Sequence, residues 1–388
     1  MRKEEKKSAS FSGEIDGRKE RTKGIRKGRG DVLLLAAVAG LALFGLVAVY
    51  SASSYSSLTT YGDRFYVAKK HCAGLLLGFA AMVFGCVFDY EKYGKAGVFL
   101  LAGCFVLLCL VFTPLGYENY GAKRWISLGG ITIQPSEIAK FAFIVFSAGY
   151  LSKKPERISS FRGVLPVLLA GGTCCGLVLA EPNMSVAVCF ALLTAAILFT
   201  GGMKLRHFFV VALPAALAVP LLIAAEPYRL RRLSAFLDPW ASPRGEGYQL
   251  LQSLYALGSG GWFGVGAFRS RQKFRFLPFS ESDFILAVIG EEYGFVGLVV
   301  LFSVMLFIVC RGLSAAARAE TLFGFFLASG ISCLYAVQTL VNVLVVTGSI
   351  PPTGLPLPLV SAGNTSLVVF LFSFGVLYNV SRGKRERE

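Results

Sequence analysis

The stretch ESDFILAVIGEEYGFVGLVVLFSVMLFIVC, residues 281–310, decides the fold class of this chain. It exceeds the roughly 20 mostly apolar residues that a helix needs to cross a bilayer, so it predicts a membrane span. Four carboxylates accompany it: Glu281 and Asp283 at its start, and Glu291 and Glu292 about 12 Å deeper at the rise of a helix. Ionisable groups in a membrane segment are costly, so they indicate either a functional site or a buried pair.

The composition supports the same class. The 388 residues are 55% hydrophobic and 16% charged, with a mean hydropathy of +0.62, which predicts a polytopic membrane protein. Much of the net charge of +16 lies in the first 30 residues and in short loops, so it does not indicate a nucleic-acid partner. The nine cysteines lie in apolar runs and the two histidines are far apart, so neither a disulfide nor a metal site is predicted.

Apolar runs predict an all-α fold with ten transmembrane helices. They fall at about 32–54, 67–88, 96–114, 136–152, 163–180, 185–202, 207–225, 283–310, 322–347 and 364–381. An even number of spans places both termini on one side. Both termini are basic, as are the loops on that side, so we expect both in the cytoplasm.

This topology divides the chain into three parts. Residues 1–30 are expected to form a disordered basic tail, residues 31–382 the membrane domain, and residues 383–388 a second cytoplasmic tail. The domain includes a large extracytoplasmic loop, residues 226–282, between spans seven and eight.

The large loop is unusually basic for an outward-facing segment. Long loops are exported regardless of charge, but an arginine-rich loop also suits an anionic ligand such as a phosphate, and both explanations stay open. Its cationic residues are Arg229, Arg231, Arg232, Arg244, Arg269, Arg271, Lys273 and Arg275. Within it, YQLLQSLYAL predicts a helix, and the glycines of residues 258–266 indicate either a flexible turn or a phosphate-binding loop.

The start of the fourth span carries a second set of charges. Lys123 and Arg124 flank Trp125, a residue typical of the membrane interface. Glu137 and Lys140 follow with helical i,i+3 spacing inside the apolar layer. They form either a structural ion pair that braces the bundle or a pair that organises a site.

Asp283 has two possible roles at the start of the eighth span. It could cap the helix, or it could act as a general base whose pKa is raised by partial burial. For Glu291 and Glu292 we expect a structural role, with one of them meeting a Lys or Arg from another span. The later segment SIPPTGLPLPLVSAGNTS, residues 349–366, holds four prolines and predicts an irregular, closely packed loop in which Ser361 offers a hydrogen bond.

Together these blocks resemble the SEDS family, which comprises FtsW, RodA and SpoVE. The matching blocks occur in family order, and the FtsW and SpoVE branch fits somewhat better than RodA. They are YSASS at 50–54, GAKRWISLGGITIQPSEIAK at 121–140, RLSAFLDPW at 232–240, GYQLLQSLYALGSGGWFGVG at 247–266, LPFSESDFILAVIGEEYGFVG at 277–297 and PPTGLPLPLVSAGNTS at 351–366. The chain departs from the family pattern at 181–185, 279–282 and 361–366.

The resemblance implies a peptidoglycan glycosyltransferase that polymerises lipid II at the outer face of the cytoplasmic membrane and releases undecaprenyl diphosphate. It implies a class B penicillin-binding transpeptidase and other division or elongation proteins as partners. It also implies that Asp283 is the essential acidic residue, and we expect it to act as the general base of an inverting reaction. The residues expected to bind substrate are Lys123, Arg124, Glu137, Lys140, Arg231, Arg244, Gln249, Arg269, Lys273 and Ser361.

A divalent cation, Mg²⁺ or Mn²⁺, is a further expectation, since it would stabilise the leaving diphosphate. Two other functions stay open. Buried charge and a broken last loop also suit a flippase for lipid-linked precursors, and the departures from the family pattern also suit a non-catalytic scaffold for a penicillin-binding protein. Whether the role lies in division, elongation or sporulation is open as well.

Overall fold

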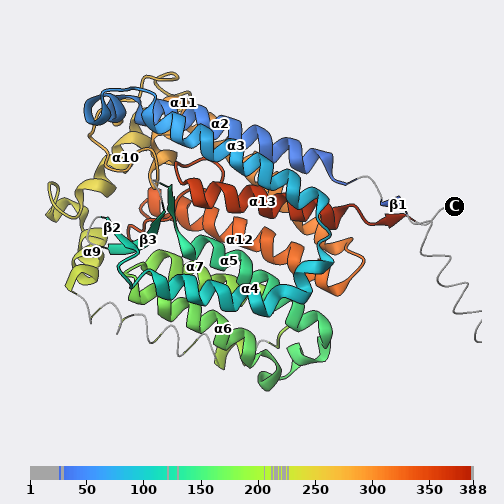
Figure 1. The fold of residues 1–388 in the computed structure, drawn as a ribbon. Helices are drawn as coiled ribbons and strands as arrows, with labels where there is room; N and C mark the ends of the chain where they lie inside the picture. The colour runs from blue at the N-terminus through green and yellow to red at the C-terminus, as the bar shows by residue number, and fades with distance from the viewer. Residues whose placement is uncertain are drawn as a thin grey trace, which may run out of the picture.

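The structure, a computed structural model, describes residues 26–27, 30–119, 122–128, 131–204, 206–210, 213, 217, 220, 224 and 227–385. It is predominantly helical (Figure 1). The long helices are α2 (Val32–Tyr61), α3 (Tyr66–Val87), α4 (Glu91–Leu110), α5 (Pro135–Lys153), α6 (Phe161–Ala180), α7 (Met184–Thr200), α11 (Ile285–Ala317), α12 (Leu322–Val346) and α13 (Asn364–Ser381). Shorter elements are η2 (Pro155–Ser159), α9 (Pro227–Leu237), η3 (Pro239–Ala241) and α10 (Tyr248–Gly260).

These helices confirm a polytopic membrane protein. In the described part of the chain, seven helices are long and apolar enough to cross a membrane: α2, α3, α4, α6, α11, α12 and α13. The predicted spans at 136–152 and 185–202 coincide with the more polar α5 and the 17-residue α7. Most of the predicted span at 207–225, and the predicted tail at 1–30 apart from Arg26, Lys27 and Gly30, lie outside the described residues.

The helices are apolar on their outer faces and closely packed inside. Phe99 is 79% exposed and Leu76 is 66% exposed, as expected where lipid replaces water around the protein. Between α3 and α13 the contact is backbone to backbone. A Cβ atom on Gly85 would lie 2.7 Å from the Phe372 carbonyl oxygen, and one on Gly375 would lie 2.1 Å from the Met82 carbonyl oxygen. Small residues at such an interface are how membrane helices approach closely.

A small antiparallel sheet was not predicted. It consists of β2 (Gly116–Asn119), β3 (Ala122–Leu128) and β4 (Ile131–Ile133), in the order β2-β3-β4, and it precedes α5 directly. Three short strands give too little alternation to be recognised from the sequence.

The sheet, α9 and α10 lie together at one end of the helical bundle (Figure 1). At the opposite end, β1 (Arg26–Lys27) pairs with β5 (Lys384–Arg385). The predicted helix within YQLLQSLYAL is confirmed as α10. The irregular loop that precedes α13 is confirmed too, and its apolar residues Leu355, Leu357 and Leu359 are buried.

Helix α11 is kinked at Gly294, where φ is 67°. The glycine-rich segment that follows α10 fills the kink: the amides of Val265 and Gly266 donate to the carbonyls of Glu291 and Glu292, at 2.9 and 3.1 Å. These amides are therefore used within the protein, so this part of the segment acts as a packed turn.

Candidate active site

Asp283 lies in the turn that leads into α11, at the end of the bundle that carries the sheet. The N-cap of α11 is Phe284, and no side chain caps this helix. Asp283 therefore does not cap α11, which was one of its two possible roles. The Asp283 side chain is half-buried and faces the loop before α13: a Cβ atom on Gly354 would lie 3.0 Å from Asp283 Oδ2. A glycine at this position lets backbone approach the carboxylate closely.

Two side chains hold the backbone on both sides of this contact. Asn342 Nδ2 of α12 donates to the carbonyl of Asp283 at 2.9 Å and to that of Leu355 at 2.7 Å. Ser361 Oγ donates to the Ser282 carbonyl at 2.6 Å and accepts from the Leu357 amide at 2.8 Å. The predicted Ser361 is thus brought to the site, where it fixes the loop against the segment of Asp283.

Two arginines set the charge around Asp283. Arg124 of β3 donates to the carbonyls of Glu181 and Pro182. Arg232 of α9 donates to the Pro352 carbonyl at 3.2 Å. Burial raises the pKa of Asp283 to about 6, while Arg124 and Arg232 pull that pKa down and Glu281 pushes it up. The carboxyl therefore titrates close to neutral pH, in the range suited to a general base.

A second acid beside Arg124 was missed as a site residue. Glu181 follows α6 and is 1% exposed, and neither carboxyl oxygen has a hydrogen-bond partner in the described residues. Burial raises the pKa of Glu181 to about 8, and Arg124 opposes that rise. The signal in the sequence was a Glu-Pro pair directly after an apolar run, a place where a polar side chain meets the end of a span.

Glu137 and Lys140 form a buried ion pair rather than lining an open site. Lys140 Nζ lies 2.7 Å from Glu137 Oε1 and donates to Gln338 Oε1 at 2.6 Å. Gln338 Nε2 in turn donates to the Pro356 carbonyl, at 3.1 Å, in the loop beside Asp283. Of the two alternatives, the geometry favours the bracing pair, and it reaches the site through Gln338. Direct contact of the pair with substrate stays a prediction.

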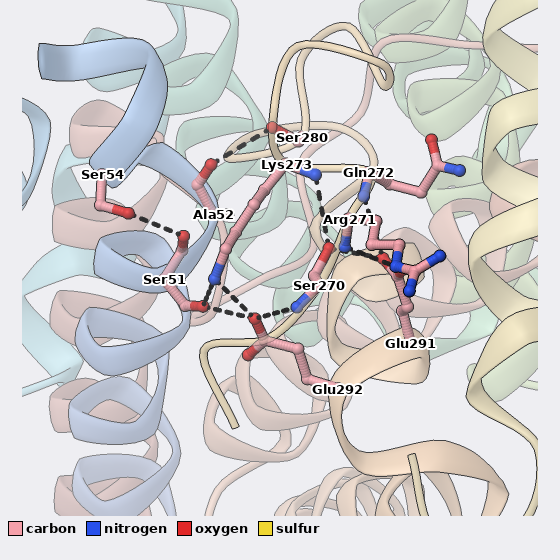
Figure 2. Close-up of polar contacts among 10 residues, drawn as sticks. All are labelled: Ser51, Ala52, Ser54, Ser270, Arg271, Gln272, Lys273, Ser280, Glu291 and Glu292. Carbon is pink, nitrogen blue, oxygen red and sulfur yellow. Dashed lines mark hydrogen bonds and ion pairs between the residues drawn. The ribbon is translucent and has the colours of Figure 1, made fainter. Parts of the chain in front are cut away.

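Glu291 and Glu292 have the structural role expected of them, as Figure 2 shows. Lys273 Nζ lies 3.1 Å from Glu292 Oε1 and 3.2 Å from Ser51 Oγ of α2, and Ser51 Oγ donates to Glu292 Oε1 at 2.6 Å. Glu291 accepts from the hydroxyl of Ser270 and from the amide of Arg271. The cationic partner comes from the large loop and not from another span, so that detail of the expectation was wrong.

The remaining predicted ligands are spread over the same end of the bundle. Lys123, Arg244 and Arg269 are exposed. Arg231 makes an exposed ion pair with Glu246 at 3.7 Å, and Gln249 Nε2 donates to the Pro278 carbonyl at 3.3 Å. Lys273 is paired as described and lines a cavity of about 430 Å³. Of the predicted set, Arg124 and Ser361 act on Asp283 or its neighbour Ser282, and so does Arg232, which was not among the predicted ligands.

The chain matches the family described as "Cell cycle protein", comprising FtsW, RodA and SpoVE, over residues 31–386. It is 41% identical over 357 residues to a probable peptidoglycan glycosyltransferase FtsW of Geobacter sp. (strain M18), covering 92% of this chain and 97% of that protein. It is 39% identical over 360 residues to stage V sporulation protein E of Bacillus subtilis (strain 168), covering 92% and 98%.

Solved structures show the same fold. A chain of a peptidoglycan synthase complex that coordinates polymerization and crosslinking aligns with a TM-score of 0.76 and 28% identity, over 91% of this chain and 98% of that one. The rod shape determining protein RodA of Thermus thermophilus aligns with a TM-score of 0.69 and 24% identity, over 92% and 98%. The chain therefore belongs to the FtsW, RodA and SpoVE family of cell cycle proteins.

Proposed function

We propose that this chain is a peptidoglycan glycosyltransferase that polymerises lipid II into glycan strands, with Asp283 as its general base. The names of the FtsW relatives support the activity. The observation that carries the assignment is the half-buried Asp283, whose pKa is raised to about 6 beside two arginines at one end of a membrane bundle.

In the proposed reaction, Asp283 accepts the proton of the 4-hydroxyl on the acceptor sugar. The freed oxygen forms a bond to the anomeric carbon of the donor, and the bond from that carbon to the diphosphate breaks, with inversion. Arg124 and Arg232 stabilise the charge that develops on the leaving undecaprenyl diphosphate. A guanidinium suits this role because its planar donors match phosphate oxygens.

A divalent cation stays a prediction. Mg²⁺ usually binds one or two carboxylates together with substrate phosphates, and Glu281, beside Asp283, is the carboxylate that would hold it here. When bound, the ion would add Lewis-acid stabilisation of the diphosphate. Within the described ranges, no three acidic, histidine or cysteine side chains are grouped as a metal site.

The proposed topology has ten spans and both termini in the cytoplasm. The pairing of β1 with β5 supports termini on one side, which requires an even number of spans. Helix α7 ends beside η2, since a Cβ atom on Gly201 would lie 2.0 Å from Ile158 Cδ1. Helix α9 begins at the end of the bundle that holds Asp283. One further crossing between Gly201 and Pro227 would connect these two places and would keep the number of spans even. Basic loops support the cytoplasmic side.

The proposed partner is a class B penicillin-binding transpeptidase, with other division or elongation proteins. The support is the fold shared with a chain of a peptidoglycan synthase complex. A glycan polymerase and a crosslinking enzyme act on the same strand, so their association has a chemical reason.

The test is polymerisation of fluorescent lipid II by the purified full chain, with and without its cognate transpeptidase. Asp283→Asn should reduce the rate by about 100- to 10,000-fold, the usual effect of losing a general base. Asp238→Asn is the matched control: Asp238 is exposed and caps η3, a role that asparagine also fills. Near-normal polymerisation by Asp283→Asn would end the assignment, and lipid II flipping without glycan chains would indicate a transporter.

A further inference from the structure

A second cavity lies at the same end of the bundle, beside the loop that touches Asp283. Its volume is about 280 Å³, and α3, the sheet, the loop before α13 and the first turn of α13 line it. Gly354 approaches Asp283, whereas Pro356, two residues further on, lines this cavity. The same loop therefore touches both places, with at most about 7 Å of backbone between those two positions.

Buried polar groups in this cavity have no partner. His71 of α3 is 1% exposed, and neither ring nitrogen has a hydrogen-bond partner in the described residues. Ser366 of α13 is 6% exposed, and the described part of the chain likewise offers its hydroxyl no partner. Buried polar atoms are almost always hydrogen-bonded, because leaving one unsatisfied costs about 1–3 kcal/mol. Two such residues lining one cavity indicate a ligand that supplies the missing bonds.

The charge of the cavity favours an anionic ligand. Helix α13 has 18 residues, its N-cap Gly363 provides no side-chain hydrogen bond, and residues 363–366 of its first turn line the cavity. The first amides of a helix have no partner inside the helix and carry partial positive charge, which makes them an anion site. Lys70 lines the cavity as well and adds a full positive charge, while Asn364 Nδ2 donates to its carbonyl at 3.3 Å.

Aromatic side chains at the same cavity favour an anion that is carried by a lipid-linked sugar. Trp125, Tyr61 and Tyr66 line it, and the rings of Tyr61 and Tyr66 stack with centroids 3.9 Å apart. Such side chains are enriched at the membrane interface. Their flat apolar faces, next to a cationic anion site, suit a saccharide attached to a diphosphate better than a free phosphate ion.

Strand β3 contributes one side chain to this cavity and its neighbour to the surroundings of Asp283. Neighbouring residues of a strand point to opposite faces, so Arg124 reaches Glu181 on the Asp283 side while Trp125 lines the cavity. The proposed reaction joins two lipid-linked chains. The donor diphosphate is attached to the reacting carbon and must lie beside Asp283. The acceptor reacts through a sugar hydroxyl that lies a disaccharide away from its own diphosphate.

We infer that this cavity is the second diphosphate subsite, which holds the anionic headgroup of the acceptor chain through His71, Ser366, Lys70 and the first turn of α13. The inference rests on the proposed function. It assigns Arg124 and Arg232 to the donor diphosphate and the cavity to the acceptor diphosphate.

Trp125 provides a direct readout of binding. In a Trp240→Phe, Trp262→Phe background it is the remaining tryptophan of the three in the chain. Undecaprenyl diphosphate in detergent should change its emission, and Ser366→Ala or Lys70→Gln should weaken this binding about tenfold each, the factor expected for about 1.4 kcal/mol. Lys69→Gln is the matched control, since exposed Lys69 pairs with Asp63 at 2.8 Å instead of lining the cavity. It should leave the binding unchanged.

Further arms separate the alternatives. Inorganic diphosphate and undecaprenol alone should each bind at least tenfold more weakly, and equal binding of inorganic diphosphate would contradict a lipid-borne ligand. Arg232→Gln should leave the Trp125 signal intact, because it alters the donor side only. A Trp125 signal that does not respond to undecaprenyl diphosphate in a chain that polymerises lipid II would overturn the inference alone. Binding that persists in a chain without polymerase activity would overturn the proposed function instead.

Discussion

Lys140 and Gln338 are joined by a hydrogen bond of 2.6 Å that no solvent reaches, and this bond connects the ion pair of α5 to the loop beside Asp283. Lys140→Met should leave the Glu137 charge buried and uncompensated, and it should destabilise the protein by about 3–5 kcal/mol. Denaturant unfolding in detergent measures the loss. Glu137→Gln combined with Lys140→Met removes both charges and should recover much of the stability. A double variant as unstable as Lys140→Met alone would show that packing, rather than charge, is what matters.

The rate of polymerisation should depend on pH through Asp283. A general base must be deprotonated, and its pKa is about 6, so the rate should fall about tenfold per pH unit below that value and level off above it. Glu281 raises this pKa, so Glu281→Gln should move the acid limb to lower pH. Arg232 lowers it, so Arg232→Gln should move the limb to higher pH. Polymerisation rates of the unmodified protein, Glu281→Gln and Arg232→Gln, measured from about pH 4.5 to about pH 8, bracket a pKa of about 6 and test both shifts. If the rate falls at the same pH in all three proteins, the group that titrates is not Asp283.

Gly294 should not tolerate a side chain. It has a φ of 67°, and a Cβ atom there would lie 2.4 Å from the Gly264 amide nitrogen. Gly294→Ala should therefore cost at least about 1–3 kcal/mol of stability, from backbone strain together with the clash. Gly103→Ala in α4 is the control, because a Cβ atom there meets nothing within 4 Å. Alanine favours a helix over glycine, so this variant should be neutral or slightly stabilising. Equal unfolding midpoints for the two variants would contradict the assigned role of the kink.

The Lys273–Glu292 pair should hold the large loop against α2 and α11. Lys273→Met leaves Glu292 with only hydrogen bonds from Ser51 and the Ser270 amide, so the segment between Gly261 and Ser280 should open more often. Limited proteolysis of that segment should become several-fold faster, as expected when local opening becomes less costly. Arg271→Gln is the control, because the Arg271 side chain is exposed. Equal cleavage rates for Lys273→Met and Arg271→Gln would show that the Lys273–Glu292 pair does not hold the large loop in place.

The sequence predicted the seven spans found in the described residues because their signal is local. Each is a long apolar run that is visible without knowledge of its neighbours, and Asp283 stands out as a carboxylate at the start of one of them. The sheet was missed because its strands have three to seven residues. β2 pairs with β3 and β3 with β4, and no single short stretch of sequence reveals such pairing.

The site was predicted only in part, because its members are far apart in the chain. Arg124, Arg232 and Gly354 approach Asp283 from β3, α9 and the last loop, and Glu181 lies beside Arg124 in the turn after α6. Composition marks the large loop as cationic but does not distinguish Lys273, which is buried against Glu292, from Arg232, which reaches the site. Which cation pairs internally depends on the fold, and the sequence alone does not give that.

The glycine contacts between α3 and α13 bring these two helices together from Gly74, where a Cβ atom would lie 2.7 Å from Asn364 Oδ1, down to Gly85. At Gly85 and Gly375 the main chains of the two helices are in contact, so a hydrocarbon tail has no room to pass between the helices there. A polyprenyl chain must therefore enter between other helices than α3 and α13. Any gate that admits substrate from the bilayer has to be sought away from this pair of helices.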